Sequence, residues 1–215
     1  MNEMRYDNFI QSASGFTVWH GAVPRHVCAR TIDALGRADS KLGAVLRRGI
    51  AHHDIGIRLC TEYILSYANT EDDVANAIRH AGREAMSLAK LARARLDGPK
   101  FCCYQKDGFF RAHRDRSVDI QDPPSVQTRT ISLVCLLNDT DASDGLPVFD
   151  GGALVLYVPG AHGAIVPVNV PLLAGSIVAF PSDLLHEVRP VRGGVRFSAV
   201  AWLYDVQPIR RGMTC

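Results

Sequence analysis

His113 and Asp115 combine residue types and a spacing that could bind a metal ion. They stand two positions apart in the stretch GFFRAHRDRS, directly after two phenylalanines. Side chains two apart in an extended strand point to the same face, so these two would converge while Arg114 and Arg116 point the other way. With one more histidine they would complete the two-histidine, one-carboxylate arrangement that holds ferrous iron and leaves coordination positions open.

The third ligand that we predict is His186, in the stretch PSDLLHEV, just after a turn-forming Pro-Ser pair. A His-x-Asp pair by itself is weak evidence, because such pairs are more often hydrogen-bonded at the surface. The chain contains a second one, His52-His53-Asp54, which we attribute to chance. Two histidines and an aspartate also suit zinc, but HEVRP lacks the second histidine of the HExxH motif, which disfavours a zinc hydrolase.

Arg196 opens the apolar run RFSAVAWLY. In a strand, Arg196, Ser198 and Trp202 would share one face. If that strand is central, the guanidinium needs a carboxylate or phosphate partner, because burying it unpaired is costly, and no acidic residue stands beside it. The alternative is an edge strand from which Arg196 reaches water or a distant acid.

These residues together resemble the prolyl 4-hydroxylase-like group of iron(II)- and 2-oxoglutarate-dependent dioxygenases. The resemblance rests on Tyr104 nine positions before His113, Phe110 three before it, and Arg196 ten after His186. The stretches FDGGAL, LAGSIVAFPS and HEVRPVRGGVRFSAVAW add to it. This joint pattern is far more specific than any one of its members.

The likeness covers roughly residues 99–205, about half of the chain. One departure is Asp107, which stands where the family usually has glycine, with Gly108 next. The departure concerns the local turn more than the metal site.

The resemblance implies a role for each matched residue. The implied Fe(II) ligands are His113, Asp115 and His186. The implied contacts of the far carboxylate of 2-oxoglutarate are Arg196, Tyr104 and Ser198. With O2, and with ascorbate as a candidate reductant, family chemistry hydroxylates an unactivated C–H bond and releases succinate and CO2. Asp115 disfavours halogenation, because halogenating relatives have a small residue at this position.

Two further residues are candidate substrate contacts. Trp202 shares the predicted face of Arg196 and could either wall the pocket or fill one end of a barrel core. Arg129 ends the polar segment 116–129, which suits a flap over the site but also resembles an ordinary surface loop. The expected substrate is a peptidyl or free amino acid, or another small metabolite.

The elements that position these residues change in character near Gly98-Pro99. Before that point we expect one helix from Pro24 to about Ala38 and a longer one to about Leu96. Candidate caps of the longer helix are Asn69 and Thr70. After that point, short runs rich in β-branched and aromatic residues alternate with turn signals, as in a sandwich or barrel.

The predicted fold is therefore one compact α+β domain. The resemblance implies that an N-terminal helical support region, residues 1–98, packs on one sheet of a double-stranded β-helix, or jelly-roll, core formed by residues 99–215. At 215 residues with 47% hydrophobic residues, the chain can bury one sizeable core.

Charge and cysteine content limit the partners and the compartment. A formal net charge of +2 marks neither a nucleic-acid nor a membrane-surface protein. Six cysteines without CxxC spacing fit reduced thiols in the cytoplasm. No stretch approaches the ~18 consecutive apolar residues of a membrane span, and no export signal is evident, so we expect no membrane partner.

Two alternatives to a hydroxylase stay open. A nucleic-acid oxidative demethylase of the same superfamily would typically carry another arginine six residues after Arg196, where this chain has Trp202. A non-catalytic jelly-roll sensor or adaptor that binds a metal or small molecule would not need a complete ligand set or a buried arginine.

Overall fold

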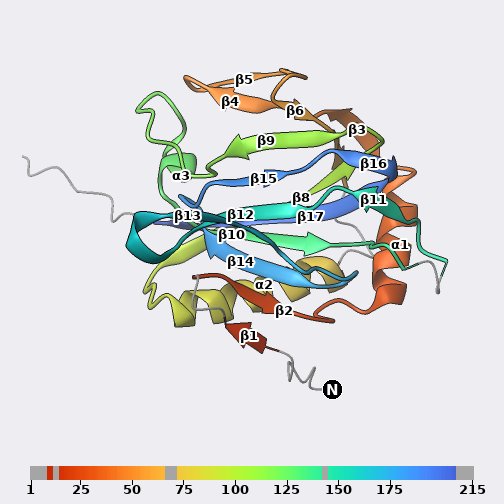
Figure 1. Cartoon of the computed structure of the whole chain (residues 1–215), viewed down its shortest axis with the longest axis horizontal. Coiled ribbons are helices and arrows are strands. Elements are labelled where there is room, and N and C mark those ends of the chain that lie inside the picture. Colours follow the sequence, from red (N-terminus) through yellow and green to blue (C-terminus); the bar gives the residue numbers. More distant parts are fainter. Residues whose placement is uncertain (1–8, 12–14, 66–71, 142–144, 207–215) are drawn as a thin grey trace, which may run out of the picture.

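The computed structural model describes residues 9–11, 15–65, 72–141 and 145–206. Antiparallel strands in two main sheets form the centre of this structure (Figure 1). The strands of the large sheet are, in spatial order, β1 (Phe9–Gln11), β2 (Thr17–Trp19), β14 (Ile177–Pro181), β10 (Arg129–Leu136), β17 (Arg196–Asp205), β8 (Ala94–Tyr104), β7 (Thr61–Ile64) and β3 (Asp39–Leu42). The strands of the small sheet are β13 (Ile165–Asn169), β12 (Leu154–Pro159), β15 (His186–Val188), β9 (Phe109–His113) and β6 (Arg58–Leu59).

Two strand pairs and four helical segments complete the described structure. The pairs are β4 (Val45–Arg47) with β5 (Ile50–His52), and β11 (Phe149–Gly151) with β16 (Val191–Gly194). The helical segments are α1 (Arg25–Leu35), α2 (Asp72–Leu88), α3 (Pro124–Gln127) and the 3-10 turn η1 (Ala161–Gly163). Among the described residues, no helix has the length and apolar character needed to cross a membrane.

The two longer helices form a layer on one face of the large sheet. Helix α2 contacts β8, β10 and β14, and α1 packs against α2. Figure 1 shows α2 on the side of the large sheet away from β9 and β15. Val74, Ile78 and Ala81 recur along α2 at three- and four-residue steps and are buried against Leu133 and Ala201 of the sheet. The apolar stripe predicted for this helix therefore covers a flat sheet.

Strand β17 separates this outer core from the space between the sheets. Its residues that pack on the helix side are Phe197, Ala199, Ala201 and Leu203. Its residues that line a cavity between the sheets are Arg196, Ser198, Val200 and Trp202. Because β17 lies between β10 and β8 in the interior of the sheet, the edge-strand alternative for Arg196 is wrong.

The N-terminal part of the chain is less helical than predicted. Besides the two helices, residues 1–98 supply β2, β3 and β7 to the large sheet and β6 to the small sheet. Gly98-Pro99 lies inside β8 and not at a boundary between structural units. The amino-acid composition changes at Gly98-Pro99, but the strand continues through this point, because β8 already begins at Ala94 in the polar stretch before Gly98.

Both predicted helices also end earlier than expected. Helix α1 follows Pro24 as predicted but ends at Leu35. Helix α2 ends at Leu88, because Lys90 has a left-handed backbone (φ 53°) and the Leu91 N–H donates to the Met86 carbonyl. Leu96 lies in β8 and packs on the same core from the sheet side, which explains its place in the apolar pattern. The predicted caps Asn69 and Thr70 lie outside the described residues.

Candidate metal centre and its pocket

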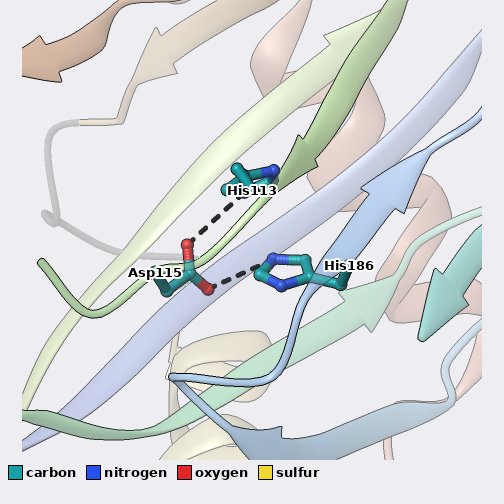
Figure 2. Close-up of side chains that lie close together, drawn as sticks. All are labelled: His113, Asp115 and His186. Carbon is teal, nitrogen blue, oxygen red and sulfur yellow. Dashed lines mark ion pairs between the residues drawn. The ribbon is translucent and has the colours of Figure 1, made fainter. Parts of the chain in front are cut away.

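The three predicted metal ligands lie together between the sheets. His113, at the end of β9, is the register partner of His186, at the start of β15, and Asp115 follows two residues after β9. Their donor atoms all lie within 4.8 Å of one another. The Asp115 Oδ1 atom is 3.6 Å from His113 Nε2 and Asp115 Oδ2 is 3.5 Å from His186 Nε2 (Figure 2).

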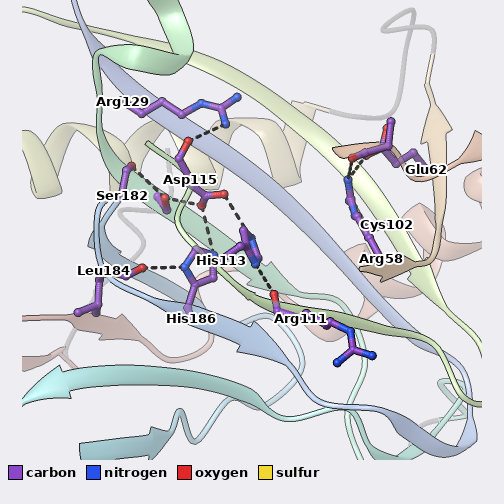
Figure 3. Close-up of polar contacts among 12 residues, drawn as sticks. Arg58, Glu62, Cys102, Arg111, His113, Asp115, Arg129, Ser182, Leu184 and His186 are labelled. Atoms are coloured by element: carbon purple, nitrogen blue, oxygen red, sulfur yellow. Dashed lines mark hydrogen bonds and ion pairs between the residues drawn. The ribbon is translucent and has the colours of Figure 1, made fainter. Parts of the chain in front are cut away.

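Both imidazole rings are oriented by main-chain carbonyls two residues earlier. The Nδ1 atom of His113 lies 2.8 Å from the Arg111 oxygen, and that of His186 lies 2.9 Å from the Leu184 oxygen (Figure 3). Because a carbonyl only accepts hydrogen bonds, each Nδ1 carries a proton, and Nε2 is the ring nitrogen left for a metal. Both rings therefore present the nitrogen that binds metals in many two-histidine sites.

Hydrogen bonds and charge hold Asp115 ionised. Its Oδ2 accepts a hydrogen bond of 2.6 Å from the Ser132 hydroxyl, which lies 2.9 Å from the Ser182 hydroxyl. Burial alone would raise the pKa of Asp115, but His186, His113 and Ser132 together hold it well below its usual range. Burial lowers the pKa of His186 to about 4, against the opposing effect of Asp115. Near neutral pH the site thus offers neutral imidazole and a carboxylate, the forms that coordinate metal.

The large sheet places a second matched pair at the other wall of the same cavity. Arg196 and Tyr104 are register partners on β17 and β8, and both are buried. The Arg196 guanidinium donates to the Ser198 hydroxyl at 3.1 Å and lies 5.4 Å from the centre of the Tyr104 ring. No carboxylate in the described part of the chain forms an ion pair with Arg196. The cavity, of about 670 Å³, is lined by this pair and by all three predicted ligands.

The sequence profile of the 2OG-Fe(II) oxygenase superfamily matches residues 99–204, the segment that contains all of these residues. The chain belongs to this superfamily. A PKHD-type hydroxylase of Teredinibacter turnerae is 29% identical over 131 residues, which are 61% of this chain and 53% of that relative. The match thus spans about half the length of this curated relative.

Solved structures of 2OG oxygenases share the fold. A prolyl-4-hydroxylase of Pseudomonas putida superposes with a TM-score of 0.66 at 21% identity, covering 91% of this chain and 95% of that one. A prolyl hydroxylase of Trichoplax adhaerens, in complex with a hypoxia inducible factor peptide fragment, gives 0.62 at 16% identity, with 90% and 84% covered. The predicted α+β jelly-roll core with helices packed on one sheet is confirmed.

The pocket fits the superfamily's cofactors, Fe(II) and 2-oxoglutarate, in charge and in donor type. Two imidazoles and one carboxylate suit ferrous iron with positions left open. A buried guanidinium without a carboxylate partner suits the far carboxylate of 2-oxoglutarate. The donor set and the cation face one cavity, so both groups could be held at once.

A buried ion pair in this pocket was not predicted from the sequence. Arg58 of β6 donates to Glu62 at 2.6 Å and to the Cys102 thiol at 3.3 Å. Its guanidinium lies 4.8 Å from the centre of the Phe110 ring, which stacks on the His113 ring at 3.5 Å. Arg58 and Phe110 thus pack behind one of the predicted metal ligands. Only the i, i+4 spacing of Arg58 and Glu62 hinted at the pair.

The two candidate substrate contacts, Arg129 and Trp202, line the same cavity as the predicted metal ligands. The Arg129 guanidinium lies 3.9 Å from the centre of the Trp202 ring. The segment 116–129 contains α3 and is joined to the turn between β4 and β5 by a bond from the Gly49 N–H to Asp122. Its role as a flap stays a prediction.

The remaining sequence features have local explanations. His52, His53 and Asp54 line a separate cavity and belong to no three-residue metal cluster among the described residues. Asp107, at the departure from the family pattern, has a left-handed backbone (φ 66°). Aspartate tolerates this conformation better than most residues, so the turn forms without glycine.

Proposed function

We propose that this superfamily member is an Fe(II)- and 2-oxoglutarate-dependent dioxygenase that hydroxylates an unactivated C–H bond. The main support for the proposal is that a candidate metal site and a candidate 2-oxoglutarate site face one cavity. The small sheet contributes His113 and His186 in register, and the large sheet contributes Tyr104 and Arg196 in register. A non-catalytic sensor or adaptor is not favoured, because it would need neither a complete ligand set nor this buried cation.

Each residue has a defined task in this proposal. His113, Asp115 and His186 hold the metal ion through two Nε2 atoms and a carboxylate oxygen. Arg196 and the Tyr104 hydroxyl bind the far carboxylate of 2-oxoglutarate, while Ser198 keeps the guanidinium in place. When bound, Fe(II) with 2-oxoglutarate and O2 supplies the oxidation that converts a C–H bond to C–OH, with succinate and CO2 as the other products.

Apolar side chains limit water around the reacting groups. Val134, Leu154, Val188 and Val200 line the cavity between the metal ligands and β17. The substrate would be a free or peptidyl amino acid, or another small metabolite. The peptide in the Trichoplax adhaerens prolyl hydroxylase structure supports a peptidyl substrate by analogy of fold alone. Ascorbate as a reductant and a cytoplasmic location stay predictions.

Anaerobic addition of Fe(II) and 2-oxoglutarate to the apoprotein tests the proposal. We expect the weak visible charge-transfer band of the metal–cosubstrate chelate in the wild type and its loss in His113→Ala. At equal 2-oxoglutarate concentration the band should weaken in Arg196→Ala and recover in part in Arg196→Lys. The matched control is Arg192→Ala, because Arg192 is exposed and pairs only with exposed Asp150. A folded, metal-loaded wild type without the band would overturn the proposal.

A further inference from the structure

The cavity extends beside the metal ligands to the stacked pair of Arg129 and Trp202. Trp202 lies on the same face of β17 as Arg196 but six residues further on, or about 20 Å along an extended strand. The guanidinium of Arg129 donates to the main-chain oxygen of Asp115 at 3.3 Å (Figure 3). The pair therefore adjoins the metal site and is well separated from the residues that would hold 2-oxoglutarate.

The guanidinium of Arg129 is poorly paired for its burial. Its nearest carboxylate, Asp97, is 3.6 Å away, and the side chain of Asp97 is 42% exposed. Its Nε–H is buried with no hydrogen-bond acceptor. The Nε–H of Arg58 in the same cavity is also buried without an acceptor, but the Arg58 guanidinium holds Glu62 at 2.6 Å. A guanidinium carries five N–H donors, so Arg129 retains capacity to bind a further anion.

The surrounding charges do not supply that anion. Lys100 lies 5.3 Å from the centre of the Trp202 ring and has no ion pair in the described structure. Arg114 and Arg116 donate to the main-chain oxygens of Asp183 and Gln127. The Asp115 carboxylate attracts Arg129 but faces His113, His186 and Ser132. Asp122 already accepts from the Gly49 N–H and the Ser117 hydroxyl.

Bound cofactors would not change the net charge of this part of the cavity. The charges of Fe(II), ionised Asp115, the two carboxylates of 2-oxoglutarate and Arg196 sum to zero. The part of the cavity lined by Arg129 and Lys100 thus stays cationic when the proposed catalytic site is filled.

We infer that Arg129, which lies over the Trp202 ring, binds an anionic oxygen group of the primary substrate, a carboxylate or a phosphate, and that Lys100 is an outer contact. The substrate is then a small organic acid whose reacting carbon faces the metal while its anion lies against Arg129. The planar fork of the guanidinium suits such two-point recognition. This inference rests on the proposed function, because the anion is assigned to the molecule that is hydroxylated.

Binding of simple anions tests the inference without knowledge of the substrate. The protein is loaded with Zn(II) and 2-oxoglutarate, which cannot turn over. It is then titrated with propionate, butyrate and methylphosphonate, and with propionamide and butyramide as neutral matches. Tryptophan emission reports binding, because Trp202 contacts Arg129 whereas the only other tryptophan, Trp19, is 1% exposed in the helix-side core. Calorimetry provides a second readout.

We expect saturable binding of the acids or the phosphonate and none of the amides. Arg129→Gln should weaken that binding by about tenfold or more, as for a lost charge-assisted pair of hydrogen bonds, and Arg129→Lys by less. Arg47→Gln is the matched control, because Arg47 is an exposed arginine at the rim of the same cavity. Preference for propionate or for methylphosphonate identifies the anion.

The outcomes separate this inference from the proposed function. Equal binding of acids and amides, or equal losses in Arg129→Gln and Arg47→Gln, overturns the inference. If the Fe(II)–2-oxoglutarate band is present in the wild type and in Arg129→Gln, such a result leaves the proposed function intact. Absence of the band in the wild type overturns both.

Discussion

Replacing Ser132 by alanine should weaken metal binding without touching a metal ligand. Ser132 is 1% exposed, and its hydroxyl lies 2.6 Å from Asp115 Oδ2. An ionised carboxylate only accepts, so Ser132 donates to Asp115 and must itself accept from the Ser182 hydroxyl. Ser132→Ala removes the hydroxyl that donates to Asp115, so the carboxylate is less well oriented and its pKa is higher.

The expected size of the effect follows from the charge on the acceptor. A hydrogen bond to a charged group contributes about 1.5–3 kcal/mol, and each 1.4 kcal/mol changes an equilibrium constant about tenfold. The dissociation constant of the metal should therefore rise about 10- to 100-fold, the range found for outer contacts of metal ligands.

Equilibrium titration with Mn(II), followed by electron paramagnetic resonance of the free ion, measures this change. Ser198→Ala is the matched control, because Ser198 is equally buried but contacts Arg196 and not Asp115. It should keep wild-type metal affinity and weaken 2-oxoglutarate binding. A folded Ser132→Ala protein that binds Mn(II) within twofold of the wild type would refute the reasoning.

Two further predictions concern stability. In the metal-free protein, burial lowers the pKa of His186 to about 4, below its unfolded value of 6.5, so the unfolded state binds more protons between these values. The free energy of unfolding should fall by roughly 3 kcal/mol as the pH drops from 6.5 to 4. Below pH 4 it should fall further, because the folded pKa of Asp115 is depressed and the unfolded state then takes up a proton at Asp115 first. Urea titrations across this pH range measure the sign and size of the change in unfolding free energy. In His186→Gln the unfolding free energy should depend less steeply on pH. Arg58→Met should destabilise the fold by about 3–5 kcal/mol, because it leaves the buried Glu62 carboxylate with only the more distant Lys41, 3.9 Å away. Arg58→Met with Glu62→Leu should recover most of that loss in thermal and urea unfolding. Equal losses in the single and double variants would contradict this.

Local periodicity explains why much of the site could be predicted. Alternation along a strand depends only on the backbone, so the shared face of Arg196 and Trp202 follows from their even spacing. The same rule predicted correctly that His113 and Asp115 face one site, although Asp115 lies two residues beyond the end of β9. The length of α2 could not be predicted in this way, because an apolar residue such as Leu96 fits the pattern whether it faces the core from a helix or from a strand.

The residues that contact the predicted metal ligands from outside were hard to identify in the sequence. Ser132 is a lone hydroxyl residue among apolar neighbours in the run SLVCLL, which marks it as unusual but does not identify its partner. Its contact with Asp115 depends on β10 lying opposite the segment after β9, and that segment is held by two main-chain bonds to Ser182. No spacing in the sequence encodes this approach.

The sequence by itself determined the ligand types, their faces and the family, because these depend on residue identity and on the two-residue repeat of a strand. Only the tertiary structure decided which side chains meet across the cavity: Arg58 with Phe110, Ser132 with Asp115, and Arg129 with Trp202. The physical reason is that strand pairing and sheet packing minimise the free energy of the whole core, and contacts between residues distant in sequence follow from that global solution.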